Sequence, residues 1–268
     1  MDVIFRRQHY YTNTPSFFIN SSNFDNLSNI YYTLSILNYQ KDELEDDFKK
    51  AIFNYLESLQ SNIGNFGFSI IDRENIDREK NGGKETYLST YYAIESYHLL
   101  GMEMKDSTKY KLMNWFKSKL EDDAFWREIN FSGIGHFYIF LKSAKAVNFD
   151  LTNYNQKIKQ KISGSIAEMK QSYDTEEITM LDINSLSHLG ADYKLNLTDI
   201  FNPAFFKDYV LEDGGYSLFK DEENSHILAT NLALEAQVIN GIRIQELSNY
   251  DDLVNTLDNF GSASFCNL

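Results

Sequence analysis

Five apolar segments of helical character each end at a glycine or an asparagine, and their spacing constrains the fold more than any other feature. The segments are Leu27–Leu37, Leu88–Leu100, Gly133–Val147, Ile178–Leu189 and Ile227–Ile239. The residues that end them lie 63, 47, 42 and 51 residues apart, and they are Asn38, Gly101, Asn148, Gly190 and the pair Asn240-Gly241. Recurrence at about 20–50 residues is the signature of a repeat architecture. We therefore expect a series of helical hairpins.

Five amphipathic segments alternate with the apolar ones and complete the predicted hairpins. They are Asp42–Leu59, Ser107–Leu120, Thr152–Lys170, Pro203–Leu211 and Gln245–Phe260. Their apolar residues recur every three or four positions, as on a helix with one solvent-exposed face. The first five segments carry bulky side chains around most of their circumference, which predicts buried helices. Capping residues are expected at Asp42 with Glu45, at Ser107, at Thr152 and at Asn202 before Pro203.

The composition predicts one globular domain. At 268 residues, of which 43% are hydrophobic, the chain can bury a sizeable core. Residues 1–25 are expected to form an N-terminal arm, and residues 26–268 a single domain. The single cysteine, Cys266, excludes an internal disulfide framework. No apolar run approaches the roughly 18–20 residues that span a bilayer, and the first residues hold no apolar signal segment, so a cytoplasmic location is expected.

The net charge of −14 argues against nucleic acid and against anionic membrane surfaces as partners. A negatively charged small substrate would need a local basic cluster or a divalent cation. The segment Ser61–Gly83 is expected to be a long charged loop, and loops of this length are usually functional or disordered. Three cations in or beside it are candidates for holding a diphosphate, with Mg²⁺ as the possible cofactor: Arg78, Lys80 and Lys84. The alternative is a solvated loop of balanced charge.

Two segments of the sequence resemble repeats of the prenyltransferase and squalene-cyclase superfamily. The first runs from Ser58-Leu-Gln-Ser-Asn-Ile-Gly-Asn-Phe-Gly-Phe68 to Glu85-Thr-Tyr-Leu-Ser-Thr-Tyr-Tyr-Ala-Ile-Glu-Ser-Tyr-His-Leu-Leu-Gly101. The second runs from Leu211-Glu-Asp-Gly-Gly-Tyr216 to His226-Ile-Leu-Ala-Thr-Asn-Leu-Ala-Leu-Glu-Ala236. Repeats of that superfamily end an outer helix, make a glycine-rich turn with an aromatic residue, and enter an inner helix.

The resemblance implies an all-α fold, an α/α toroid of about five hairpins whose inner helices surround a cavity. Periodicity alone would not distinguish a toroid from an open solenoid. The superfamily usually closes its ring with about six hairpins. The N-terminal arm could fill the remaining gap, or the ring could open onto a protein partner or a second copy of the chain.

The segment Asp174-Thr-Glu-Glu-Ile-Thr-Met180 is similar to the Asp-x-Asp-Asp-Thr-Ala signature of class II terpene cyclases. The resemblance implies that Glu176 is the general acid, with Asp174 and Glu177 as its neighbours. Clustered carboxylates raise one another's pKa, so one of them can stay protonated near neutral pH and act as an acid. Two of the three Asp positions hold Glu here, which displaces the proton. The alternative is that the acids complement a helix dipole.

Four histidines fall on or at the ends of the apolar segments. His136 and His226 are near segment starts and are candidates for substrate binding, whereas His98 and His188 are expected to be partly buried and hydrogen-bonded. Protein prenyltransferases of the superfamily hold zinc with Asp, Cys and His, and His226 occupies a position like the family histidine. Because the corresponding cysteine is missing here, zinc is not expected.

Aromatic residues on the apolar segments are the other substrate-binding candidates. The aromatic residues predicted to bind the substrate are Tyr31, Tyr32, Tyr91, Tyr92 and Phe137. Ring faces stabilise cations through the ring quadrupole, which suits a carbocation; the alternative is that these rings simply fill the core. The sequence thus leaves two functions open. One is a terpene cyclase-like isomerase acting on a prenyl diphosphate, and the other is a non-catalytic toroid that binds a lipid, a peptide or a protein.

Overall fold

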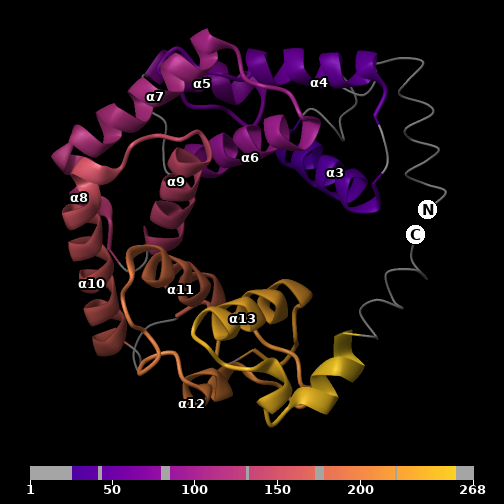
Figure 1. Cartoon of the computed structure of the whole chain (residues 1–268), viewed down its shortest axis with the longest axis vertical. Coiled ribbons are helices and arrows are strands. Elements are labelled where there is room, and N and C mark those ends of the chain that lie inside the picture. The colour runs from indigo at the N-terminus through magenta and orange to yellow at the C-terminus, as the bar shows by residue number, and fades with distance from the viewer. Residues whose placement is uncertain are drawn as a thin grey trace. The chain divides into compact units, whose positions relative to one another are not determined.

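The computed structural model describes residues 26–41, 44–79, 85–130, 133–172, 178–220 and 222–257. In this part of the chain every regular element is a helix, apart from two isolated β-bridges. The described residues pack as two compact units, one from residues 26–125 with 139–151 and the other from residues 126–138 with 152–257, and helix α9 contributes to both (Figure 1). The predicted N-terminal arm lies outside the described residues. The predicted single domain over residues 26–268 stays a prediction.

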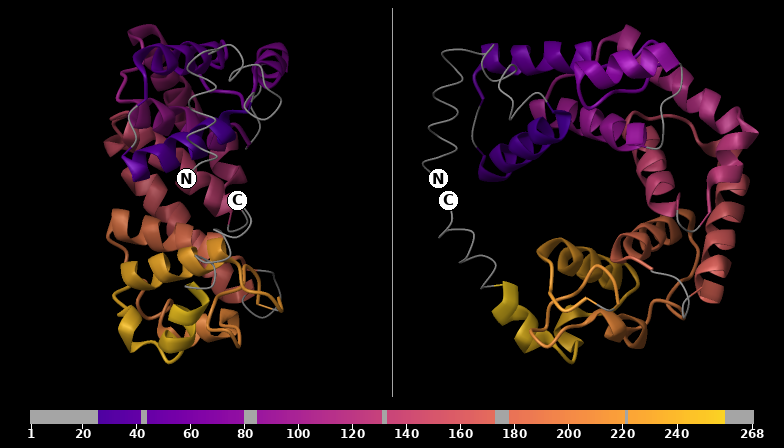
Figure 2. Two further views of the ribbon diagram at one scale, coloured as in Figure 1. Left: turned by 90° about the vertical axis from the view of Figure 1, so that its right-hand side faces the viewer. Right: turned by 180° about the vertical axis from the view of Figure 1, so that it is seen from behind.

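The first unit contains two layers of helices. One layer holds α3, α6 and the C-terminal part of α9, and the other holds α4 and α7 (Figure 2). α3 packs along α6, and α4 packs on α6. Trp115 and Phe116 of α7 contact Phe140 of α9, with ring centroids 5.6 and 5.2 Å apart. The core of the unit therefore lies between the layers. The bounds are α3 Leu27–Gln40, α4 Asp46–Ser58, α5 Ile70–Glu79, α6 Glu85–Leu100, α7 Asp106–Glu121 and α9 Ile134–Ala146.

The second unit is built in the same way from later helices. α11 packs along α13 and also against α10. Gly135 of α9 lies against Leu181 and Ser185 of α11. Residues 250–257 form a last helix. The other bounds are α8 Asp123–Glu128, η2 Thr152–Tyr154, α10 Asn155–Ser172, α11 Met180–Tyr193, α12 Pro203–Phe206, η3 Lys207–Tyr209, α13 Ile227–Ile239 and η4 Ile244–Glu246, with α8 crossing the boundary between the units.

The turns before α6 and α13 are structurally equivalent. The backbone N–H of Phe66 donates to Thr90 Oγ1 at 3.1 Å, and the N–H of Tyr216 donates to Thr230 Oγ1 at 3.0 Å. The antiparallel bridges Gln60 to Phe66 and Val210 to Tyr216 close the two turns. Residues of the first turn therefore correspond to residues 150 positions later, and residues of α6 to residues 140 positions later in α13. The two repeats recognised in the sequence are thus confirmed as one local structure.

Each turn also ties down the start of an earlier helix. The backbone N–H of Leu27, the first residue of α3, donates to the carbonyl oxygen of Phe68 at 2.9 Å. The N–H of Met180, the first residue of α11, donates to the carbonyl oxygen of Leu218 at 2.9 Å. A backbone N–H group that would otherwise be unpaired at each helix N-terminus has an acceptor in this way. Each of these backbone hydrogen bonds also connects a helix start to a turn that follows later in the sequence.

Three of the five predicted helix ends are confirmed. α6 ends before Gly101, which has φ +66°, and Asn148 has φ +60° just beyond α9. α13 ends before Asn240, and Gly241 has φ +81°. The predictions at Asn38 and Gly190 are wrong, because α3 continues to Gln40 and α11 to Tyr193.

The true ends of α3 and α11 are at lysines in the left-handed conformation. Lys41 has φ +58° and Lys194 has φ +57°. Gly190 serves packing instead, since a Cβ atom placed there would lie 2.5 Å from Leu197 Cδ1. A glycine inside a helix can thus mark close packing as well as a helix end.

Of the predicted caps, only Asn202 is confirmed. Its Oδ1 accepts from the N–H groups of Ala204 and Phe205 at 3.0 and 3.3 Å, although α12 is a single turn. The predictions at the other positions are wrong or lie outside the described residues. Glu45 itself is the N-cap of α4, Lys105 is that of α7, Thr152 lies in η2 before α10, and Asp42 is not described.

The predicted long loop at residues 61–83 is partly wrong, because residues 70–79 form α5. Ser69 starts this helix by accepting from the N–H of Asp72 at 3.2 Å through its hydroxyl. Arg73 and Asp77 form an i,i+4 ion pair at 3.7 Å, and Ile76 is buried. One buried residue and a few local contacts therefore stabilise a helix in a segment of very polar composition.

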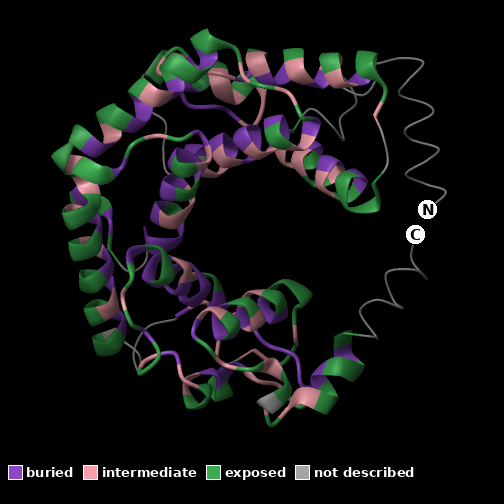
Figure 3. Cartoon of the chain, in the orientation of Figure 1, coloured by how far each residue is buried: buried purple, intermediate pink, exposed green. Residues whose placement is uncertain are grey.

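The apolar helices are less completely buried than the sequence predicts (Figure 3). On α3 the buried residues form one face, whereas Tyr32 is 54% exposed and Tyr39 is 88% exposed. On α13 the residues Ile227, Leu228 and Val238 are more than half exposed. None of the described helices is both long enough and apolar enough to cross a bilayer.

Candidate functional site

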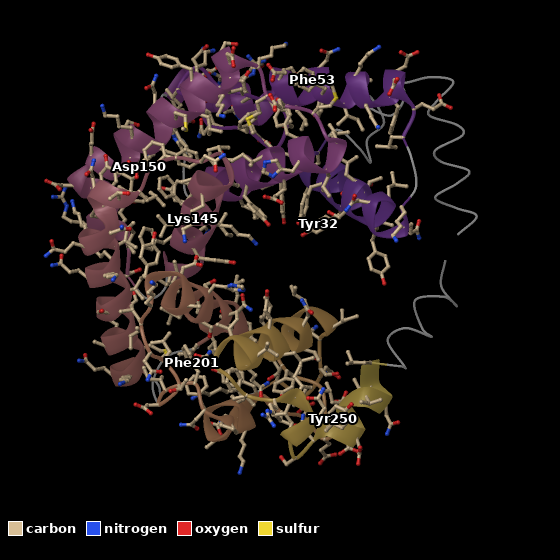
Figure 4. All side chains as sticks on the ribbon, in the orientation of Figure 1. Tyr32, Phe53, Lys145, Asp150, Phe201 and Tyr250 are labelled. Carbon is tan, nitrogen blue, oxygen red and sulfur yellow. The ribbon has the colours of Figure 1, made fainter. Side chains whose placement is uncertain are left out.

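Four tyrosines gather on the first unit, two from α3 and two from α6, and we call Tyr31, Tyr32, Tyr91 and Tyr92 the tyrosine cluster. The rings of Tyr31 and Tyr92 stack with centroids 4.6 Å apart, and the hydroxyls of Tyr32 and Tyr92 lie 2.8 Å apart. The Tyr31 and Tyr91 centroids are 6.1 Å apart. Tyr32 extends from the side of α3 away from α4, whose Phe53 packs instead on Tyr97 (Figure 4). The four tyrosines predicted for substrate binding are therefore brought together.

Burial and mutual contact raise the pKa of two hydroxyls of this cluster, those of Tyr31 and Tyr92. Burial, followed by the charge of the neighbouring Tyr91, raises the pKa of Tyr31 to about 12. Burial and the hydrogen bond with Tyr32 raise the pKa of Tyr92 above its ordinary value. At neutral pH Tyr31 and Tyr92 are thus uncharged rings with polar edges.

A cation of the chain already lies over one ring of the cluster. Lys142 Nζ of α9 is 5.0 Å from the centroid of Tyr91. This is the distance at which a ring quadrupole attracts a positive charge. Chemically, the cluster can hold an apolar or cationic group against ring faces and offer hydroxyls at its edge.

A second polar group lies between α9, α11 and α13 in the other unit. His188 Nε2 is 3.1 Å from Glu235 Oε1, and Asn184 Nδ2 donates to Glu235 Oε2 at 3.0 Å. The imidazole stacks on Tyr138 with centroids 5.1 Å apart. The expected partly buried, paired state of His188 is confirmed, whereas His98 is half-exposed beside Glu95. Sequence reasoning missed Glu235, although the matched repeats place it at the position of Glu95.

Asp182 closes the N-terminus of α11 in a capping box. Thr179 is the N-cap and its hydroxyl accepts from the N–H of Asp182, while the Asp182 carboxylate accepts from the Thr179 hydroxyl at 2.6 Å. Burial raises the pKa of Asp182, against the lowering effects of the Thr179 hydrogen bonds and of His136. His136, a predicted binding residue, is therefore close enough to act electrostatically on this carboxyl.

The free energy of unfolding of Asp182→Asn, taken relative to that of the wild type, is expected to increase as the pH rises. A carboxyl whose pKa is raised by folding stabilises the native state below its unfolded pKa of 3.8, and that contribution is lost as the pH rises through the folded pKa. The amide cannot ionise, yet its oxygen can still accept from Thr179. Urea unfolding of both proteins at about pH 4 and about pH 7 checks this. A constant difference between the two proteins at both pH values would contradict it.

Three other predicted site residues are described, each in its own surroundings. Phe137 is buried against Trp126, His226 is the exposed N-cap of α13 at 3.8 Å from Glu222, and Arg78 is exposed in the last turn of α5. Five predicted residues lie outside the described part of the chain: Lys80, Lys84, Asp174, Glu176 and Glu177. Among the described residues, no group of three or more His, Cys, Asp or Glu side chains is arranged to hold a metal ion.

Comparison with known proteins gives one match. The model of the prenyltransferase alpha-alpha toroid domain family matches residues 4–156, which is more than half of the chain. No curated protein and no solved structure matches the chain. The match includes α3, α6 and the tyrosine cluster, and it confirms the all-α toroid class predicted from the sequence. The chain therefore belongs to the prenyltransferase alpha-alpha toroid domain family.

Proposed function

We propose that this chain is a terpene cyclase-like isomerase that binds a prenyl diphosphate and starts its cyclisation by protonation from Glu176. The observation that carries the proposal is the tyrosine cluster in a chain of the prenyltransferase toroid family. Ring faces that are partly exposed suit both the apolar chain of an isoprenoid and the positive charge that forms during its cyclisation.

The proposed reaction balances without a redox partner. The carboxylic acid of Glu176 transfers its proton to the terminal alkene, a C–H bond forms, and the other alkene carbon becomes a tertiary cation. The next alkene attacks this cation and closes a ring. A proton then leaves the carbon beside the final cation and passes to water, so the product is an isomer that retains the diphosphate. Asp174 and Glu177 would keep Glu176 protonated by like-charge repulsion.

The diphosphate end of the substrate needs positive charge. Arg78 is exposed at the end of α5, and Lys80 and Lys84 follow it closely in the sequence. Mg²⁺ enters the proposal only as the counter-ion of the diphosphate. His136 and His226 would contact the substrate as hydrogen-bond donors.

The test is product analysis. The purified protein is incubated with farnesyl or geranylgeranyl diphosphate and Mg²⁺, and the products are separated and identified by mass spectrometry. A cyclised isomer that retains its diphosphate is the expected result. Release of diphosphate with formation of a hydrocarbon would contradict protonation as the first step.

Tyr32→Leu is expected to lower kcat/KM by about 5- to 30-fold, the effect of losing about 1–2 kcal/mol of cation–π stabilisation. Leucine keeps apolar bulk but removes the ring face and the hydroxyl bonded to Tyr92. The matched control is Tyr39→Leu on the same helix, where the side chain is 88% exposed. Equal effects of the two substitutions would exclude a specific role for the cluster.

A second candidate function is a toroid that binds an apolar ligand or a protein partner without turnover. Apolar side chains exposed at both ends of α13 favour it, because exposed apolar surface can serve as a binding site; they are Ile227, Leu228 and Val238. This candidate predicts that a prenyl diphosphate either binds unchanged or does not bind. Binding measured by calorimetry, with no product after prolonged incubation, would favour it over the cyclase.

A further inference from the structure

A cavity of about 490 Å³ lies in the second unit, lined by residues of α12, η3, α13 and the segment that follows α13. Phe206, Val210 and Leu247 give it apolar walls. Lys207 and Arg243 also line it, and both are exposed side chains with a positive charge. No described side chain that lines this cavity is acidic. The volume is in the range of small-molecule sites.

In the first unit a carboxylate of the chain stands at the position of one of these two cations. The matched turns place Glu57 at the position of Lys207. The Glu57 side chain is 11% exposed, and it accepts from the Tyr97 hydroxyl at 2.8 Å and from the Thr108 hydroxyl at 2.7 Å. Lys105 Nζ is 3.5 Å from the same carboxylate. In that repeat, the Glu57 carboxylate therefore links α4 to α6 and α7 through the hydrogen bonds that it accepts.

In the second unit, residues of different chemistry occupy the positions of this carboxylate and of its tyrosine donor. The position of Glu57 holds the cation Lys207, and the position of Tyr97 holds Gln237, which is fully buried and lines the cavity. Gln237 Nε2 donates to the Tyr216 hydroxyl at 3.0 Å and to the Ala233 carbonyl oxygen at 3.3 Å. Because a carbonyl can only accept, this contact fixes the orientation of the amide.

The other end of that amide lacks a partner. Gln237 Oε1 is buried and accepts no hydrogen bond. Leaving a buried acceptor unpaired is unfavourable, so such a group is usually satisfied by a ligand or an ordered water. The residues that line the cavity therefore include two cations, one glutamine with an unsatisfied acceptor and several apolar side chains.

We propose that this cavity binds a small organic acid with an apolar body and a hydrogen-bond donor. The carboxylate lies between Lys207 and Arg243, where Arg can form a bidentate contact, and the donor reaches Gln237 Oε1. The ligand supplies the carboxylate that Glu57 supplies in the first unit. The cavity belongs to the second unit and the tyrosine cluster to the first, and this proposal does not depend on the cyclase proposal.

The test is isothermal titration calorimetry of the full chain with three related probes. 3-Phenyllactate has a carboxylate and a hydroxyl donor, 3-phenylpropionate has only the carboxylate, and methyl 3-phenylpropionate has neither a charge nor a donor. The expected order of affinity is phenyllactate, then phenylpropionate, with no detectable binding of the ester. Equal binding of the ester and the acids, or no binding of either acid at about 10 mM, overturns the proposal.

Substitutions distinguish binding in the cavity from a general effect of the protein's charge on the affinity for phenyllactate. Lys207→Ala with Arg243→Ala is expected to weaken phenyllactate binding by at least about tenfold, since two charge-assisted contacts are lost. Lys170→Ala, an exposed lysine on α10, is the matched control and should leave affinity unchanged. If the double variant and Lys170→Ala lose affinity equally, the assignment of the binding site to this cavity is overturned. Gln237→Leu should remove only the preference for phenyllactate over phenylpropionate, and retention of that preference contradicts the role of Oε1.

Discussion

Glu176→Gln is expected to lower the rate of cyclisation by at least about 100-fold, because the amide cannot transfer a proton to the alkene. Glutamine has nearly the same shape as glutamic acid, so substrate binding should be retained and KM should change little. The rate of formation of cyclised diphosphate, followed by mass spectrometry under saturating substrate, measures the effect. Thermal unfolding of the same samples measures whether the fold is altered.

The competing interpretation of Glu176 is that it complements the dipole of α11. The described N-terminus of that helix is already capped by Thr179 and Asp182 in a capping box. The midpoint of thermal unfolding should therefore stay close to that of the wild type. Glu177→Gln removes the same charge from the neighbouring position, and it should lower the rate less than Glu176→Gln because Glu177 acts only by keeping Glu176 protonated. If both variants lose stability and keep activity, the dipole interpretation is correct and the catalytic one is wrong.

The turns before α6 and α13 could be predicted because their determinants are local. A glycine permits the turn, an aromatic residue follows, and a threonine in the next helix accepts the backbone N–H of that aromatic residue. Each of these residues lies within about 25 positions of the others, so one repeat contains the whole pattern. The resemblance to the toroid family rested on these same residues, and the family match confirms it.

Features that depend on packing could not be predicted in the same way. The sequence predicts a helix end at Gly190, but the role of this glycine is set by Leu197, which packs against it from the following segment. α5 forms in a segment whose composition is typical of a loop, because Ile76 is buried by the rest of the unit.

The candidate site shows the same limit. The apolar segments predict the four tyrosines as candidates, but the stacking of their rings and the contact between two hydroxyls depend on the packing of α3 against α6. The pairing of His188 with Glu235 joins two helices 47 positions apart, and no local pattern in the sequence indicates it.

Gly64→Ala is expected to destabilise the first unit by about 3–5 kcal/mol, among the largest effects of a single substitution. Gly64 has φ +107°, which an L-residue adopts only with strain of about 1–3 kcal/mol. A Cβ atom would also collide with the backbone carbonyl of Lys111 in α7, which cannot move as a flexible side chain could. Gly214, with φ +80°, meets the backbone of Asp252 and Leu253 in the same way, so Gly214→Ala should have a similar effect.

Two other glycines separate the two causes. Gly101 has φ +66° but no atom within 4 Å of its ideal Cβ position, so Gly101→Ala should cost only the backbone strain. Gly164 lies inside α10 with the same open surroundings, and Gly164→Ala should stabilise the protein by about 0.5–1 kcal/mol through helix propensity. Urea unfolding of the four variants gives the free energies of unfolding. If Gly64→Ala lowers the free energy of unfolding no more than Gly101→Ala does, the collision with the backbone of Lys111 makes no contribution. Backbone strain alone would then explain why the turn requires glycine.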